Sequence, residues 1–135
     1  MMIMTTIDGK NAILGRLASN VAKQLLKGES VSIVNAEKII ITGSPDQIKE
    51  KYLARRRRGS AHHGPFYPTR PDLIVRRTVR GMLPYKTNKG RNAFKKLRVY
   101  VGTPQDVSDV QKMEASIKSN YITVGEVAKT LGWRE

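Results

Sequence analysis

SVSIVNAEKIIITG, residues 30–43, is the stretch of this sequence that decides the fold. It contains two short runs rich in β-branched residues, 31–34 and 39–42, with the polar segment NAEK between them. Short apolar runs of this kind, bounded by turn-forming residues, predict buried β-strands. We therefore expect a small sheet here, covered by helices that the flanking sequence supplies.

The sequence before this stretch predicts one strand and one helix. IMTTI, residues 3–7, is typical of a short strand, and the Asp8–Gly9 pair after it predicts a turn. Gly28 stands where the following helix should end. The helix is indicated by apolar residues that recur at three- and four-residue spacing: Leu14, Leu17, Ala18, Val21, Ala22 and Leu25.

The sequence after the stretch predicts further helices and one more strand. Ser44 and Pro45 favour a helix that begins there and runs toward the arginines, and Pro71 opens another helix that Pro84 breaks. In this second helix Val75, Val79 and Leu83 should face inward, with Arg76, Arg77 and Arg80 on other faces. Residues 92–97 indicate one or two more helical turns, and residues 98–102 a strand.

The last part of the chain predicts a long connection and a closing helix. Residues 103–119 are polar and weakly periodic, which is typical of a connection. Thr123 and Glu126 form a capping-box pattern at the start of an apolar helical repeat. The resulting order of strand, helix, strand, strand, helices, strand and helix favours an α/β protein.

Size and composition indicate one globular domain over residues 1–135. The chain has 135 residues, is 39% hydrophobic and contains no cysteine, which fits a reducing compartment and excludes disulfides. The apolar start is interrupted by Asp8 before it reaches the length of a signal peptide, and no stretch approaches a membrane span. We expect a cytoplasmic protein that does not bind membranes.

The net charge of +14 is concentrated in one block of the chain. Residues 51–98, called the basic block below, hold 15 Lys and Arg against one acid, Asp72, while the rest holds 10 basic and 10 acidic residues. A block of this kind builds a positive potential over one face and attracts a polyanion. A solvated charged surface would scatter such residues instead.

YLARRRRGSAHHGPFYPTRP, residues 52–71, stands at the start of the basic block and contains no acid. Prolines stiffen its second half, and arginine side chains present planar donors to phosphate oxygens. We expect an extended prong that contacts several phosphates. Phe66, Tyr67 and Tyr85 lie among the charges, either as stacking surfaces for bases or as local core packing.

Catalytic and metal-binding patterns are absent from the sequence. His62 and His63 have no Cys, Asp or Glu nearby to complete a metal site, so hydrogen bonding or stacking on RNA is the simpler role. GKNAILGR, residues 9–16, lacks the order of a phosphate-binding loop, and the basic block has no carboxylate cluster. We expect no enzyme activity, no cofactor, no metal and no small-molecule substrate.

Three motifs resemble a known family. ILGRLAS, VNAEKIIITG and especially RRTVRGMLPYKTNKGRNAFKKLRVYVG are similar to the universal large-subunit ribosomal protein thirteen family, over nearly the whole chain. The short link LLKGESVSIVNAEK and the ending VAKTLGW resemble archaeal-type members. The resemblance implies a three-layer α/β/α domain with a small, mostly parallel four-stranded sheet and a basic extended loop. It also implies a structural, early-assembly component that binds large-subunit rRNA without catalysing a reaction.

The resemblance and the charge count select the same candidate RNA-binding residues. Arg16 is added because it lies on the polar face of the first predicted helix, Arg70 because it belongs to the basic block, and the three aromatic residues as stacking surfaces. The rRNA-facing set that the resemblance implies is Arg55, Arg56, Arg57, Arg58, His62, His63, Arg76, Arg77, Arg80, Lys86, Lys89, Arg91 and Lys95.

The expected partners are large-subunit rRNA and neighbouring large-subunit ribosomal proteins, with no homo-oligomer. Two other classes share the basic face. An RNA-modifying enzyme would need a cofactor loop or a general base, and the sequence shows neither. A free RNA- or DNA-binding regulator would be an isolated, reversible module, often with a repeated or symmetric reading element.

Overall fold

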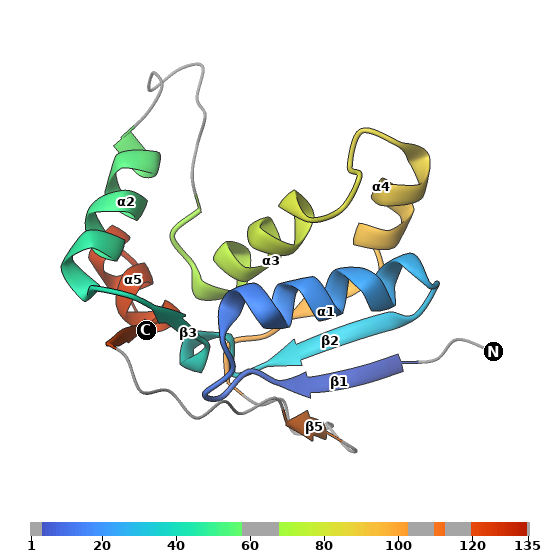
Figure 1. The fold of residues 1–135 in the computed structure, drawn as a ribbon, viewed down its shortest axis with the longest axis horizontal. Helices are drawn as coiled ribbons and strands as arrows, with labels where there is room; N and C mark the ends of the chain where they lie inside the picture. Colours follow the sequence, from blue (N-terminus) through green and yellow to red (C-terminus); the bar gives the residue numbers. More distant parts are fainter. Residues whose placement is uncertain (1–3, 58–67, 103–109, 113–119, 135) are drawn as a thin grey trace.

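The main sheet has four parallel strands in the order β4-β2-β1-β5 (Figure 1). The computed structural model describes residues 4–57, 68–102, 110–112 and 120–134. The strands are β1 (Met4–Asp8), β2 (Ser30–Val34), β4 (Leu97–Val99) and β5 (Val110–Lys112). The expected α/β class, with a small and mostly parallel four-stranded sheet, is confirmed.

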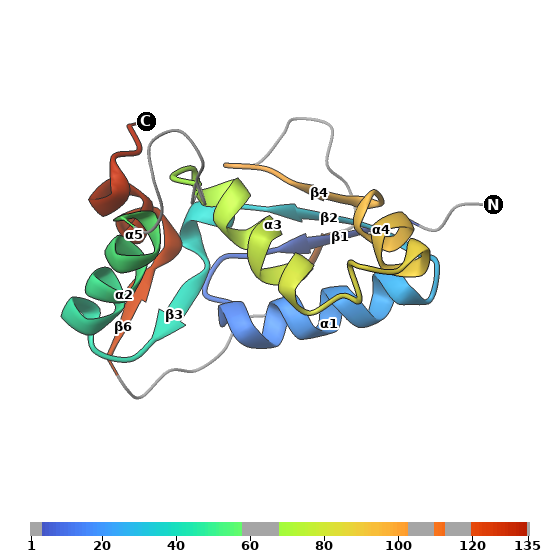
Figure 2. The same ribbon diagram turned by 90° about the horizontal axis from the view of Figure 1, so that it is seen from above.

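One face of this sheet carries the core. The register pairs Ile7 with Ile33 and Ile33 with Val99, so that apolar side chains of three neighbouring strands line up. Helices α1 (Leu14–Leu26), α3 (Pro71–Gly81) and α4 (Asn88–Phe94) lie on one side of the sheet (Figure 2). The predicted apolar face of α1 is fully buried there, and Gly28, with φ +95°, follows its end as expected.

A second, two-stranded sheet lies at the end of the main one. β3 (Ile40–Thr42) pairs antiparallel with β6 (Tyr121–Thr123), and helices α2 (Pro45–Arg57) and α5 (Val124–Leu131) lie beside them (Figures 1 and 2). The strand expected at residues 39–42 is present over residues 40–42, but the expectation that it is buried is wrong beyond Ile40, since Thr42 is exposed. The two β-branched runs of the opening stretch thus belong to different sheets.

The chain leaves the main sheet at the segment NAEK. Asn35 has φ +56°, and the 3-10 turn η1 (Ala36–Lys38) follows it directly. The Asn35 side chain donates a hydrogen bond from Nδ2 to Asp8 Oδ1 at 2.9 Å, which holds the turn against the end of β1. Asn adopts this left-handed conformation more readily than most residues, because its short polar side chain can hydrogen-bond locally.

Two short strands were not expected. The sequence of residues 103–119 predicts only a connection, but residues 110–112 form β5 at the edge of the main sheet beside β1. β6 precedes the predicted closing helix and pairs with β3. Each has only three residues, which is too short to show alternation, and β5 has the largely polar sequence VQK. Their pairing is set by a distant partner rather than by local sequence.

The prediction of an extended prong is wrong for its first part. Residues 52–57 form the last turns of α2, so Arg55, Arg56 and Arg57 are helical. Tyr52 is buried and anchors this part of the helix to the core. Basic residues at a helix C-terminus also complement the partial negative charge of its free carbonyl groups. The rest of the expected prong up to residue 67 lies outside the described residues.

Candidate nucleic-acid interface

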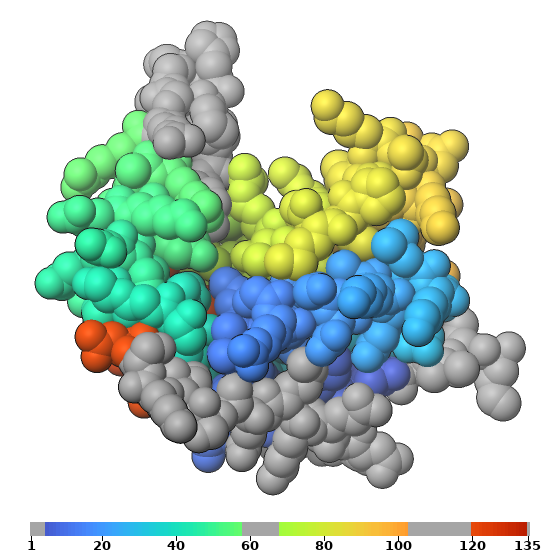
Figure 3. Space-filling model, in the orientation of Figure 1, coloured from blue at the N-terminus to red at the C-terminus, as the bar shows by residue number. Residues whose placement is uncertain are grey.

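Most of the described basic residues of the block belong to helices on one side of the molecule, or to the turn before α4. The end of α2, the whole of α3, and α4 with the turn before it occupy the upper side in Figure 1, and they are called the basic face below. α4 and the end of α2 lie on either side of α3 (Figure 1), and the surface over α3 is hollowed beside α4 (Figure 3). Residues far apart in the sequence therefore converge around one concavity.

Helix α3 forms the floor of the hollow. Ile74, Val75 and Val79 bury one side of this helix in the core, as expected for Val75 and Val79. At 100° per residue the opposite side carries Arg76, Arg77 and Arg80, together with the exposed Leu73. The three arginines are half-buried. The Nε atom of Arg76 is itself buried, without a hydrogen-bond partner in the described part of the chain.

Two of these arginines stack on aromatic rings from the next segment of the chain. The Arg76 guanidinium carbon lies 4.8 Å from the Phe94 ring centre, and that of Arg80 lies 5.1 Å from the Tyr85 ring centre. The two rings meet edge to face at 5.7 Å. The four side chains thus form one continuous cluster, called the arginine–aromatic cluster. Such contacts restrict the guanidinium groups without neutralising them.

The structure supports both roles considered for Tyr85, local packing and stacking on a base. Its ring is 41% exposed and packs on Phe94 and Arg80, so it is both a local packing residue and a surface available to a ligand. Phe94 was not among the candidate residues. Its contacts depend on how the turn before α4 folds back onto α3, which helical periodicity does not reveal.

The turn before α4 is held by close backbone contacts. Thr87 Oγ1 donates to Pro84 O at 2.7 Å and accepts from Gly90 N at 3.2 Å, which caps α4. A Cβ at Gly90 would lie 1.9 Å from Pro84 O, so only glycine allows this approach. The turn and the helix that it caps present four exposed candidate residues to solvent: Lys86, Lys89, Arg91 and Lys95.

The end of α2 presents arginines in a different way. The Arg55 guanidinium lies 5.1 Å from the ring centre of Tyr52 in the same helix, one turn back. Arg56 and Arg57 are exposed. The helix thus carries these arginines, and the ring contact of Arg55 lies within α2 itself.

The remaining candidates are not brought into the basic face. Arg16 is exposed in the first turn of α1, and Arg70 is exposed and paired with Asp72, Nη2 to Oδ2, at 3.2 Å. Five candidates lie outside the described residues and stay predictions: Arg58, His62, His63, Phe66 and Tyr67.

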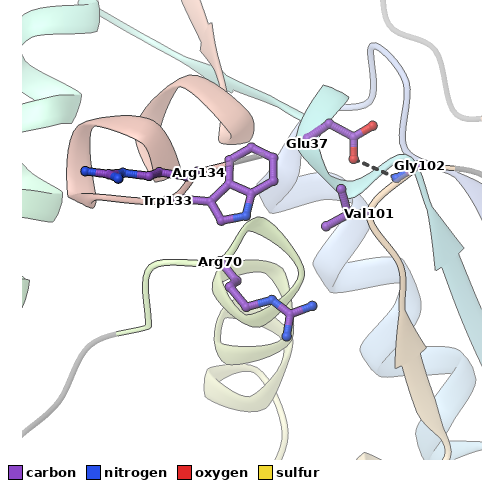
Figure 4. A pocket seen from close by; sticks show the side chains of 6 residues that line it. All are labelled: Glu37, Arg70, Val101, Gly102, Trp133 and Arg134. Atoms are coloured by element: carbon purple, nitrogen blue, oxygen red, sulfur yellow. Dashed lines mark hydrogen bonds between the residues drawn. The ribbon is translucent and has the colours of Figure 1, made fainter.

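A small pocket lies where four elements meet near the start of α3 (Figure 4). It has a volume of ≈ 410 Å³, and the following residues line it: Glu37, Arg70, Val101, Gly102, Trp133 and Arg134. Within the described ranges, no group of three or more His, Asp or Glu could hold a metal ion. No helix in the part of the chain that the structure describes is long and apolar enough to cross a membrane.

The fold and its surface define a small α/β protein with a preformed basic face. A family model described as ribosomal protein L13 matches residues 3–106. The chain belongs to the ribosomal protein L13 family, whose members are structural and non-enzymatic components of the ribosome, located in the cytoplasm. The resemblance seen in the sequence is thereby confirmed.

Archaeal relatives match almost the full chain. The large ribosomal subunit protein uL13 of Methanopyrus kandleri is 51% identical, over 96% of this chain and 87% of that protein. The proteins of the same name from Methanococcoides burtonii and Methanosarcina barkeri are 48% and 49% identical, each over 96% of this chain and 98% of the relative. These matches agree with the archaeal character expected from the sequence.

Proposed function

We propose that this protein is a structural constituent of the large ribosomal subunit that binds large-subunit rRNA through its basic face. The observation that carries the proposal is the arginine–aromatic cluster on the floor of the hollow. Relatives named as large ribosomal subunit proteins support the choice of ribosomal RNA over other polyanions. Neighbouring ribosomal proteins are the further partners that we propose.

The basic face suits an RNA backbone for an electrostatic reason. Its single acid, Asp72, already has an arginine partner at 3.2 Å, so little negative charge opposes a phosphate. Arg76 and Arg80 are restricted by aromatic rings before any ligand arrives, so binding costs them less side-chain entropy. Arginine then offers its planar fork to phosphate oxygens.

We also propose a role in early assembly of the subunit. α2 and α4 project on opposite sides of α3, so a single folded domain offers separate positive surfaces to more than one RNA segment (Figure 1). A protein that contacts several segments at once lowers the repulsion between their phosphates and favours the compact RNA fold. This action needs no catalytic group.

Salt dependence of RNA binding tests the electrostatic part of this proposal. If roughly six to eight basic side chains meet phosphates, affinity for an rRNA fragment should fall about a thousandfold between 50 and 200 mM monovalent salt. Binding would be measured by filter retention at several salt concentrations. A nearly flat response would contradict the proposal.

Sedimentation separates this proposal from the alternatives. Native protein should travel with large subunits when a lysate is fractionated by high-speed centrifugation. Recovery only in small, free complexes would favour the free regulator or the RNA-modifying enzyme instead. The described residues hold no cluster of potential metal ligands of the kind that metal-dependent chemistry would use.

A further inference from the structure

The pocket beside the start of α3 contains the only tryptophan of the chain, Trp133. Gly132, with φ +114°, ends α5 in the left-handed conformation, and Trp133 N donates to Ala128 O at 2.9 Å. This pair of features is the Schellman arrangement that closes many helices. The indole is therefore held in place by the end of a helix, and its ring packs partly against the core.

A carboxylate on the opposite side of the pocket is also fixed. Glu37 Oε2 accepts a hydrogen bond from Gly102 N at 2.9 Å (Figure 4). The backbone of Glu37 is pressed against α5, where a Cβ at Gly125 would lie 2.9 Å from Glu37 O. Oε1 of Glu37 has no hydrogen-bond partner within the described ranges, so it remains able to accept from a ligand.

The remaining walls are apolar on one side and cationic on the other. Val101 is 40% exposed and lies across the pocket from the indole (Figure 4). The guanidinium of Arg70 lies at the start of α3 beneath the indole, whereas that of Arg134 points away from it. A flat ligand can enter between the indole and Val101, with Glu37 at its edge and Arg70 near its charged part.

We propose that this pocket binds a single unstacked guanine nucleotide of RNA. Aromatic side chains stack with bases that leave a helix, and polar groups then read the base edge. Guanine offers adjacent N1–H and N2–H donors on that edge, which suit a carboxylate acceptor, and Arg70 would meet the phosphate. The volume of ≈ 410 Å³ is within the range of small-molecule sites.

The inference rests on the proposed function, because the guanine would belong to the RNA that the basic face binds. Arg70 belongs to the basic block and leads directly into α3, so the pocket borders that face. An acidic peptide is the competing ligand for a site with arginine and indole. An acidic peptide would place a carboxylate near that of Glu37, whereas a guanine would place its N1–H and N2–H donors there, which favours the nucleotide.

Fluorescence of the full-length protein tests the pocket without any RNA. Trp133 is the sole tryptophan, so its emission reports this site alone. Titration with GMP should quench the emission, with IMP, which lacks the 2-amino group, several-fold weaker and UMP about tenfold weaker. Ribose 5-phosphate should have no effect. Absence of quenching by GMP, equal quenching by ribose 5-phosphate, or quenching by an acidic peptide instead would overturn the proposal.

Two variants link the pocket to RNA. Glu37→Gln keeps an oxygen for Gly102 N but removes the charge, so GMP should lose its advantage over UMP. Trp133→Leu should weaken binding of an RNA hairpin with one unpaired guanine about tenfold and leave binding of a fully paired duplex unchanged. Equal effects on both RNAs, with circular dichroism showing a folded variant, would contradict the inference.

A third variant distinguishes the failure of this inference from failure of the proposed function. Arg80→Ser alters the arginine–aromatic cluster and not the pocket. It should weaken both RNAs alike and leave GMP quenching unchanged. If the wild-type protein binds neither RNA, the proposed function fails; if it binds both without GMP quenching, only the guanine site fails.

Discussion

The arginines at the end of α2 and those along α3 occupy two different settings. Arg55 stacks on Tyr52 of its own helix, and Arg56 and Arg57 extend into solvent. Arg76 and Arg80 instead stack on Phe94 and Tyr85, which follow α3 in the chain. Arg56 and Arg57 lie on an exposed helical turn, whereas Arg76 and Arg80 are tied to tertiary packing.

The difference shows that the effect of an arginine on RNA binding cannot always be separated from its effect on stability. At the end of α2 a substitution can change electrostatics and leave the core intact. Along α3 the same substitution also removes a contact that joins two segments of the fold. Mutations in the two settings should therefore divide differently between stability and RNA binding, and four experiments test this from the largest effect to the smallest.

Gly90→Ala should have the largest effect on stability. The added Cβ would lie 1.9 Å from Pro84 O, which is backbone and cannot rotate away, so the turn before α4 must move. We expect a loss of about 3 kcal/mol in the free energy of unfolding, the upper end of overpacking costs, measured by denaturant titration. RNA binding should fall with it, because Tyr85 and Phe94 flank the displaced turn.

Gly15→Ala is the matched control for that variant. Gly15 lies in α1, and a Cβ there would have no heavy atom within 4 Å. Alanine should leave the free energy of unfolding unchanged or raise it by less than about 1 kcal/mol. If both glycine variants had the same free energy of unfolding, the close approach of Gly90 to Pro84 would not require glycine at that position.

Phe94→Leu and Arg76→Met test whether packing and charge are coupled on α3. Phe94→Leu keeps an apolar side chain but removes the ring that the Arg76 guanidinium stacks on. We expect the interaction free energy between residues 76 and 94 to fall by about 1 kcal/mol. A double-mutant cycle on unfolding and on RNA affinity measures that energy. Additive effects in both measurements would mean that the ring does not position the arginine.

Asp72→Asn should lower stability without lowering RNA affinity. Asp72 lies in the first turn of α3, and its Oδ2 pairs with Arg70 at 3.2 Å. Removing this charge should cost about 0.5 to 1 kcal/mol of folding stability through the helix dipole. RNA affinity should stay constant or rise, because an anion leaves the basic face. A clear drop in affinity of the folded variant would count against this account.

Arg56→Ser with Arg57→Ser should change stability least. Both side chains are exposed in the last turn of α2. The free energy of unfolding should therefore change by no more than the few tenths of a kcal/mol typical of surface sites. The slope of log affinity against log salt should nevertheless shrink by about 1.5, because each lost phosphate contact removes roughly 0.7 to 0.9. A destabilised variant with an unchanged slope would show that Arg56 and Arg57 contribute to folding and not to RNA binding.

Local patterns were sufficient to predict much of the fold. The apolar spacing of α1 and the inward valines of α3 follow from helical geometry alone, and Gly28 ends α1 as expected. The capping of α5 was equally visible, since Thr123 accepts from Glu126 N at 3.2 Å. In each case the signal and the structure it causes lie within a few residues of each other.

Features that depend on distant partners could not be predicted in this way. β5 is polar and three residues long, and it is a strand only because β1 offers a free edge. The turn at Asn35 sends residues 40–42 into a second sheet, although their composition suits the first. The basic block was evident from charge, but the stacking on Phe94 required the fold of the turn before α4.

The antiparallel pairing of β3 with β6 also bears on the order in which the chain can fold during its own synthesis. β1, β2 and β4 can assemble once residue 99 has emerged, because all three strands precede that point. β3 waits for residues 121–123, and Val124 N then donates to Ile39 O at 2.8 Å. Domains generally fold from the N-terminus as synthesis proceeds. Residues 121–131 are synthesised after the strands β1, β2 and β4, and they close the half of the molecule that carries the end of α2. The three strands can therefore pair in the nascent protein before α2 is secured.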